Sequence, residues 1–247
     1  MTSALKLRLG TTFALAIALF VLPGCGGGGR TLKPWFYRFT NAIPNLSALD
    51  LYRDKVLVDS GRAYLSSTAY TEMNIEESSF FFDMNEASTS NVIDSIVIDR
   101  VDNQSIHIIA IGTNAPGGGN PQPVARMVPI IITRTTPSGN ARVIVVHGFQ
   151  KGIGVQTPNV DIVRTGLIAP IIEDLEFGRS AVRSLTPGTY DFTIRQAGLL
   201  KGNIFTKTGV VLEAGKIYLF LLKGVEGSLA PFNPDITIIE EPPRDEN

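Results

Sequence analysis

Residues 186–196 read TPGTYDFTIRQ, and this stretch decides the fold class. Pro187 fixes its own φ angle and Gly188 tolerates a positive one, so the start of the stretch predicts a tight turn. The residues that follow alternate between large apolar and polar side chains, as in a strand with one buried face. The side chains expected to point into a core are those of Tyr190, Phe192 and Ile194.

The chain from residue 35 onward has the same character. Short runs of β-branched and aromatic residues are separated by Gly, Pro, Asn and Asp. Strands are expected at residues 35–40, 49–53, 80–84, 95–99, 106–111 and 128–134, and again at 142–147, 160–163, 189–196, 209–213, 217–222 and 235–240. The best helical candidate, residues 168–177, contains Pro170. The chain is therefore predicted to be all-β.

The two halves of this region repeat each other at a distance of about 110 residues, the length of one domain. Residues 49–52 (LDLY) match residues 160–163 (VDIV) at a shift of 111, and the same shift matches His107 to Tyr218. Residues 213–216 are expected to form a hairpin turn between two strands.

About seven short strands per 100 residues, present twice, predict two tandem immunoglobulin-like antiparallel β-sandwiches. The first sandwich is assigned to residues 35–136 and the second to residues 140–241. The Gly- and Pro-rich residues 115–123 are assigned to a loop of the first sandwich, and residues 242–247 to a charged tail.

The amino-terminal residues have the pattern of a bacterial lipoprotein signal peptide. Two basic residues precede an apolar run at residues 11–22, which is shorter than the about 20 residues of a membrane-spanning helix. Leu22, Gly24 and Cys25 then stand where the lipobox of bacterial lipoproteins has its Leu, Gly and Cys. The resemblance implies that residues 1–24 are removed and that Cys25 is lipidated.

Lipid on Cys25 makes the membrane the predicted partner of the amino terminus. Several acyl chains give a lasting anchor, because each buried methylene adds about 0.8 kcal/mol. Residues 25–34 include a run of glycines and are interpreted as a flexible tether. Gly26 stands where Gram-negative lipoproteins retained at the inner membrane commonly have Asp. The predicted location is the cell envelope, and the outer membrane if the source is Gram-negative.

Beyond the signal peptide, residues 35–241 resemble domain-of-unknown-function family 4397. The matching residues of the second repeat are 142–147 (RVIVVH), 160–162 (VDI), 187–190 (PGTY) and 214–218 (AGKIY). Those of the first repeat are 37–44 (YRFTNAIP) and 49–52 (LDLY). The resemblance implies tandem Ig-like repeats on a secreted or lipid-anchored bacterial protein, and it implies no reaction.

Composition excludes several classes of partner and site. Lys and Arg number 22 against 23 Asp and Glu, so the chain lacks the basic excess that binding to nucleic acid needs. A single cysteine allows neither an internal disulfide nor a zinc site built on several cysteines. The two histidines, His107 and His147, are assigned to different sandwiches, and no calcium-loop motif is present. We therefore predict no metal and no cofactor.

His147 with Asp161 is the one candidate catalytic pair, because His147 follows a predicted strand and Asp161 lies in the next one. No G-x-S-x-G or similar motif supplies a nucleophile, so the His147 ring is interpreted as satisfying a turn. His107 is interpreted as outward-facing or packed in a core, and Glu240 and Glu241 as solvated charges. No catalytic residue is predicted.

Two groups of aromatic residues bear on recognition. Residues 35–37 (WFY) follow the tether and are a candidate contact patch, whereas Phe81 is interpreted as packed beneath a loop or against the other sandwich. Loops at residues 148–158 and 115–123, or an open sheet edge, are the expected binding surfaces.

The sequence thus predicts a non-enzymatic, lipid-anchored cell-envelope protein with a structural or recognition role, possible partners being an envelope protein or a glycan. One alternative is a glycan- or ligand-binding module on the cell surface, which requires solvent-facing aromatic residues beside polar groups. The least favoured alternative is a hydrolase that uses His147 and Asp161.

Overall fold

A computed structural model describes residues 34–73, 76–100, 104–114, 124–152, 155–198 and 202–242. The signal peptide, Cys25 and the loop at residues 115–123 lie outside the described residues. The described residues contain strands and no helix, which confirms the all-β prediction. Within them, no helix has the length and hydropathy of a membrane span.

The first half of the described chain contains eight strands. They are β1 (Trp35–Asn41), β2 (Ala48–Arg53), β3 (Val56–Ala63), β4 (Thr71–Met73), β5 (Ser79–Glu86), β6 (Val92–Asp99), β7 (Ser105–Ile111) and β8 (Arg126–Ile132). The second half contains eight more. They are β9 (Ala141–His147), β10 (Val160–Arg164), β11 (Ile172–Leu175), β12 (Ser180–Leu185), β13 (Gly188–Gln196), β14 (Asn203–Leu212), β15 (Ile217–Lys223) and β16 (Asp235–Glu241).

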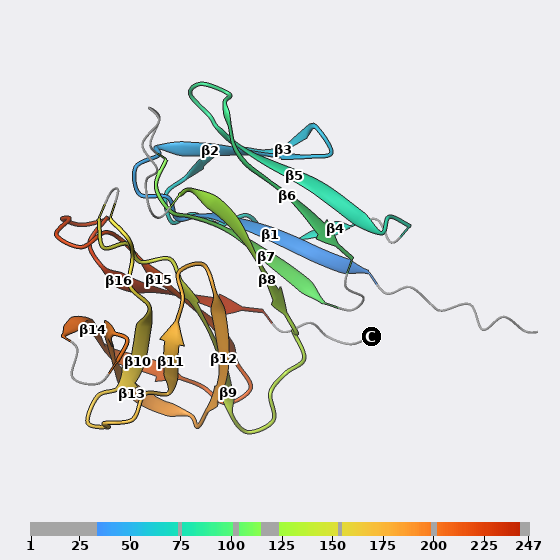
Figure 1. Ribbon diagram of the computed structural model, residues 1–247. Coiled ribbons are helices and arrows are strands. Elements are labelled where there is room, and N and C mark those ends of the chain that lie inside the picture. The colour runs from blue at the N-terminus through green and yellow to red at the C-terminus, as the bar shows by residue number, and fades with distance from the viewer. Residues whose placement is uncertain are drawn as a thin grey trace, which may run out of the picture. The chain divides into compact units, whose positions relative to one another are not determined.

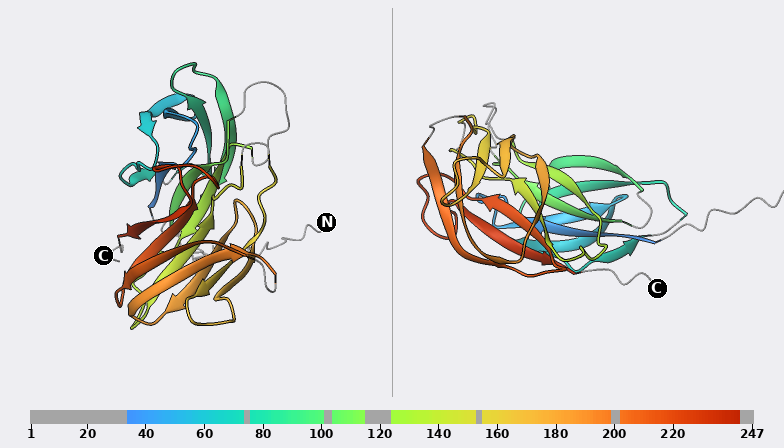
Figure 2. Two further views of the ribbon diagram at one scale, coloured as in Figure 1. Left: turned by 90° about the vertical axis from the view of Figure 1, so that its left-hand side faces the viewer. Right: turned by 90° about the horizontal axis from the view of Figure 1, so that it is seen from below.

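The strands form four sheets of four strands, which make two sandwiches (Figures 1 and 2). The first sandwich consists of the sheets β4-β1-β7-β8 and β3-β2-β5-β6. The second consists of β12-β9-β15-β16 and β11-β10-β13-β14. Adding eight to each strand number of the first sandwich gives the second, so the tandem duplication extends to the whole topology.

Two details of the pairing differ from the prediction. The sheets are not purely antiparallel, because β1 pairs in parallel with β7, and β9 in parallel with β15. The first strand of each sandwich joins a sheet beside a later strand that runs in the same direction. Residues 213–216 do not form a hairpin either, because β14 and β15 belong to different sheets and the turn carries the chain from one sheet to the other.

The matching of His107 to Tyr218 is wrong by one residue. Tyr218 belongs to the core of the second sandwich, whereas His107 lies on the face of β7 that points away from the first core, which Ile106 and Ile108 occupy. A shift of one residue along a strand reverses the face of every side chain. His107 therefore corresponds to Leu219, which likewise faces away from its own core.

Each sandwich has its own core of large apolar side chains. The first core includes Trp35, Phe39 and Phe82, and the second includes Phe192 and Phe220. The alternation seen in the sequence is confirmed, since the side chains buried on β13 are those of Tyr190, Phe192 and Ile194.

A third apolar cluster lies between the two sandwiches. We call it the junction; it joins the outer faces of β4-β1-β7-β8 and β12-β9-β15-β16, and its buried members are Ala42, Ile109, Ile111, Val128, Ile130, Ile132, Ile144, Val146, Ile217, Leu219 and Leu221. All residues of β7 and of β15 are buried. These two strands are covered by a core on one face and by the junction on the other.

A buried polar cluster accompanies the junction. His107 Nδ1 lies 2.7 Å from Glu241 Oε1, and the Tyr70 hydroxyl donates to Glu241 Oε2 at 2.6 Å. Thr40 Oγ1 lies 2.6 Å from His107 Nε2, and Arg38 Nη1 lies 3.5 Å from Glu241 Oε2. Glu241, from the second sandwich, thus accepts hydrogen bonds from three residues of the first. The interpretation of Glu241 as a solvated charge is wrong.

The protonation states in this cluster follow from burial and hydrogen bonding. Burial lowers the pKa of His107, although Glu241 opposes the shift, so His107 is a neutral donor. Burial alone would raise the pKa of Glu241, but the hydrogen bonds from His107 and Tyr70 and the charge of Arg38 hold it below its ordinary value. Glu241 is therefore a carboxylate whose charge is met by hydrogen bonds across the junction.

Glu241→Ala is expected to lower the free energy of unfolding by about 3 to 5 kcal/mol, because it leaves the buried donors of His107 and Tyr70 without an acceptor. The matched control is Glu240→Ala, which removes an exposed neighbour paired with Lys216 and is expected to cost under about 1 kcal/mol. Urea unfolding of the three proteins measures both values. Equal losses in the two variants would contradict a role for Glu241 in joining the sandwiches.

Candidate functional site

The structure does not bring His147 and Asp161 together as a catalytic pair. His147 is fully buried, and its Nε2–H donates to the carbonyl of Pro158 at 3.1 Å. Asp161 instead accepts from the backbone N–H of Asp174 at 3.0 Å and from Arg195 at 3.2 Å. The His147 ring bonds a loop carbonyl, as predicted from the sequence, and Asp161 bonds a backbone N–H and a neighbouring strand.

The environment of His147 disfavours the charged ring. Its ring stacks on Phe149 and meets Phe177 edge-on, with centroids 6.2 and 5.7 Å apart. Nδ1 has no hydrogen-bond partner among the described residues. Burial lowers the pKa of His147 to about 4.

No group of three or more His, Cys, Asp or Glu side chains that could hold a metal ion occurs in the described part of the chain. His107 lies in the junction and is bonded to Glu241. Cys25, the predicted lipidation residue, lies outside the described residues.

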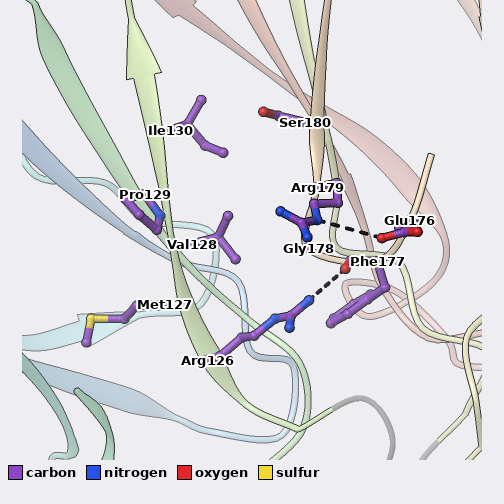
Figure 3. Close-up of a pocket in the computed structure, with 10 residues that line it drawn as sticks. All are labelled: Arg126, Met127, Val128, Pro129, Ile130, Glu176, Phe177, Gly178, Arg179 and Ser180. Carbon is purple, nitrogen blue, oxygen red and sulfur yellow. Dashed lines mark hydrogen bonds and ion pairs between the residues drawn. The ribbon is translucent and has the colours of Figure 1, made fainter. Parts of the chain in front are cut away.

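A groove lies between the two sandwiches (Figure 3). One wall is the edge strand β8, from Arg126 to Ile130, and the other is the β11–β12 turn, from Glu176 to Ser180. This part encloses about 590 Å³. A second part of about 500 Å³ shares Arg126, Glu176 and Phe177 and adds the side chains of Val124, Gln156, Thr157 and Asn159. We call the two parts together the Arg126 groove.

Arg126 crosses the Arg126 groove from one sandwich to the other. Its Nη2 donates to the carbonyl of Phe177 at 2.6 Å, and its guanidinium lies 5.2 Å from the centroid of the Phe177 ring. Gly178 makes this approach possible, because it has a φ of +74° and a methyl group there would collide with the guanidinium. Arg179 is exposed nearby and pairs with Glu176 at 3.7 Å.

The edge of β8 along the groove is closed to strand addition at two positions. The backbone N–H of Met127 points away from β7 and donates to Asp94 Oδ2 at 2.6 Å. Pro129, two residues along, points its nitrogen to the same side and has no N–H. The geometry of this edge therefore does not support the hypothesis of a partner strand pairing with β8.

The loop at residues 148–158, predicted to be a binding surface, supplies residues to the groove and to the contact between the sandwiches. Gln156 and Thr157 line the groove. Gln150 is buried and joins the sandwiches: its Nε2 donates to the Gly112 carbonyl at 2.8 Å, and its Oε1 accepts from Thr113. The companion loop at residues 115–123 lies outside the described residues.

A second hollow of about 550 Å³ lies between loops of the two sandwiches. We call it the Tyr64 hollow; its lining residues are Pro44, Asn45, Leu46, Ser47, Ala63, Tyr64, Leu65, Pro231 and Phe232. None of them is an acid, a base or a histidine. The rings of Tyr64 and Phe232 lie 5.1 Å apart at 46° to each other.

The sequence predictions for two other groups of aromatic residues, residues 35–37 and Phe81, are both wrong. Trp35 and Tyr37 are buried in the first core, so residues 35–37 do not form an exposed patch. Phe81 is 36% exposed on the outer face of β5, contrary to the interpretation that it packs away from solvent. No sequence signal marked Arg126, Phe177 or Phe232, because the two walls of each hollow come from different sandwiches.

Comparison with known proteins adds little to this geometry. No family model and no curated protein matches the chain. Among the solved structures similar to it is a carbohydrate-binding module of family 26 from Eubacterium rectale, in complex with maltoheptaose. The sequence identity is 8%, the match covers 85% of this chain and 98% of that one, and the TM-score is 0.21. A likeness this distant carries no argument about ligands, and the resemblance to family 4397 stays a prediction.

Gly178→Ala is expected to displace Arg126 from Phe177. Its matched control is Gly166→Ala, which also has a positive φ, of +90°, but has open space around the added methyl group. Both variants incur backbone strain of about 1 to 2 kcal/mol. Gly178→Ala should lose about 1 to 2 kcal/mol more, from the hydrogen bond and the cation–π contact. Denaturant titrations measure the difference, and it should vanish in an Arg126→Ala background.

His147 is expected to make stability depend on pH. Its pKa is about 4 in the folded protein and near 6.5 when unfolded, so between these values the unfolded chain binds more protons. The stabilisation is complete above pH 6.5 and is lost as the pH falls toward 4, by about 3 kcal/mol. Unfolding free energies of the wild type and of His147→Gln should therefore converge as the pH falls. Parallel curves would contradict the burial of a neutral ring.

Proposed function

We propose that this protein is a lipid-anchored recognition protein of the cell envelope, without a catalytic role. In this proposal, lipid on Cys25 holds the amino terminus at the membrane, at the outer membrane in a Gram-negative source. The loop end of the two sandwiches, where the Arg126 groove and the Tyr64 hollow lie, binds an envelope partner.

The observation that supports the proposal is the separation of the start of β1 from the hollows. In the sheet of the first sandwich, Phe36 pairs with Ser105 at one end, and Ile111 pairs with Arg126 at the other. The seven residues from Ser105 to Ile111 span about 20 Å at the usual strand rise. The start of β1 and the end of β16 lie on the same side of the two sandwiches (Figure 2, right view).

The tether fits this arrangement. Residues 25–34 can reach at most about 35 Å when fully extended. The sandwiches would therefore stay close to the membrane with β1 nearest to it. The loop end would face outward, where a partner in the envelope can reach it.

The placement of the chemically reactive side chains supports binding over catalysis. His147 and Asp161 are bonded to different partners, and His107 and Glu241 are buried in the junction. The Arg126 groove, by contrast, offers exposed guanidinium, carboxylate and amide groups, which suit reversible polar contacts with a partner.

A second candidate function is glycan binding at the cell surface. The Tyr64 hollow favours it, because two aromatic rings meet there beside the amide of Asn45 and the hydroxyl of Ser47. This is the combination of aromatic and polar groups on one surface that the glycan hypothesis requires.

Photo-cross-linking of the anchored protein in whole cells tests the proposal. A photoreactive residue at the exposed position Gln156, in the groove, should give a discrete adduct with an envelope component. The same residue at Thr136, an exposed position at the opposite end of the sandwiches, should not. Equal labelling from both positions would contradict recognition by the loop end.

The anchor is tested in the same cells. Cys25→Ala should move the protein from the membrane fraction to the soluble fraction and abolish incorporation of labelled palmitate, because the thiol is the only site for the lipid. Unchanged membrane fractionation of this variant would contradict lipid anchoring while leaving the cross-linking result to judge recognition.

A further inference from the structure

The Tyr64 hollow has the chemistry of a site for a neutral ligand. Its lining carries no carboxylate, ammonium, guanidinium or imidazole group. Burial raises the pKa of Tyr64 to about 12, so its hydroxyl stays uncharged at neutral pH. A charged ligand entering this hollow would lose hydration without gaining a counter-charge.

Two aromatic rings form an open angle in the hollow, one from each sandwich. Tyr64 follows β3, and Phe232 belongs to the β15–β16 loop, with ring planes 46° apart. Phe232 remains 36% exposed, although it is a large apolar side chain at the surface. Exposed aromatic faces suit the apolar C–H face of a pyranose ring, which packs flat against them and keeps its hydroxyls at the edge.

The Tyr64 hydroxyl does not offer a polar contact to a ligand. Its oxygen is buried and has no hydrogen-bond partner among the described residues. A buried hydroxyl without a partner costs about 1 to 3 kcal/mol, so most such groups in proteins are paired. The polar side chains that a ligand can reach in the hollow are those of Ser47 and Asn45, both exposed, and the Asn45 amide also bonds the backbone of Asn114.

The wall that carries Phe232 is preformed. Lys223 donates from Nζ to the carbonyls of Pro231, at 2.8 Å, and Asn233, at 3.2 Å. The backbone of Phe232 is held on both sides: its N–H donates to Leu229, and its carbonyl accepts from Val225 at 2.7 Å. A ring held in place before binding spares the ligand the entropy cost of ordering a loop.

We propose that the Tyr64 hollow binds one neutral pyranose unit of a glycan, packed against Phe232 and Tyr64, with its hydroxyl groups toward the exposed side chains of Ser47 and Asn45. This inference rests on the second candidate function. A proline-rich peptide also prefers aromatic surfaces, but it reads an extended groove with successive aromatic rings, and a single pair meets here.

The test is calorimetric titration of the full mature chain carrying Cys25→Ala. The probes are neutral oligosaccharides of glucose, xylose, mannose and N-acetylglucosamine, with a polyproline peptide in parallel. Calorimetry is preferred to tryptophan fluorescence because the single tryptophan, Trp35, is buried in the first core. At least one oligosaccharide should bind.

Two variants assign the binding to the hollow. Phe232→Ala should weaken binding at least tenfold, and Ser47→Ala, which removes only a hydroxyl of the lining, should weaken it about fivefold. The matched control is Phe81→Ala, since Phe81 has the same 36% exposure but lies on the outer face of β5. It should bind as the parent does, and far-ultraviolet circular dichroism checks that all variants are folded.

The possible failures are distinguishable. If oligosaccharides bind but neither variant weakens them, the hollow is not the site, and glycan binding itself stands. If no oligosaccharide binds at millimolar concentration, or only the peptide binds, the proposed ligand is wrong. Recognition by the loop end is judged separately, by cross-linking from Gln156.

Discussion

The apolar contact between the outer faces of two sheets determines the rest of this structure. In a sandwich that stands alone, the central strands have one face on the core and one in water. Here β7 and β15 are buried along their whole length, because Ile109, Leu219 and Leu221 meet across the junction. Each sandwich therefore completes the other, and the two hollows between them have walls whose positions depend on this contact.

The polar cluster at the junction favours one relative orientation of the two sandwiches, which apolar packing alone does not do. By strand register, Glu241 corresponds to Ile132 in the first sandwich, and His107 corresponds to Leu219 in the second. One pair of equivalent positions is thus a hydrogen bond between a neutral imidazole and a carboxylate, and the other pair is apolar. A buried carboxylate tolerates only the arrangement that delivers its donors, so it favours a single docking of the two duplicated units.

Sequence patterns predicted the strands whose residues alternate between apolar and polar or are all apolar. They missed four of the edge strands. The four strands missed are β3, β4, β11 and β12, and each is an edge strand of a different sheet. Strands β3, β4 and β12 are largely exposed and β11 has only four residues, so the four carry little of the periodic apolar signal on which prediction depends. Glu241 was predicted to be solvated for a related reason. Nothing in the sequence around the two neighbouring carboxylates, Glu240 and Glu241, indicates that the other sandwich covers only Glu241. Arg126 and Phe177, 51 residues apart, could be brought together only by the docking of the two units.

The blunted edge of β8 has a consequence for a molecule confined to a surface. Proteins held on a membrane by one end share an orientation and collide far more often than they would in bulk solution. Under the proposed anchoring, identical sheet margins would meet side by side, which is the geometry that seeds β-aggregates. Because Asp94 accepts the hydrogen bond of the Met127 N–H and Pro129 has no N–H, copies in a crowded layer would find no free donor at these two positions of β8.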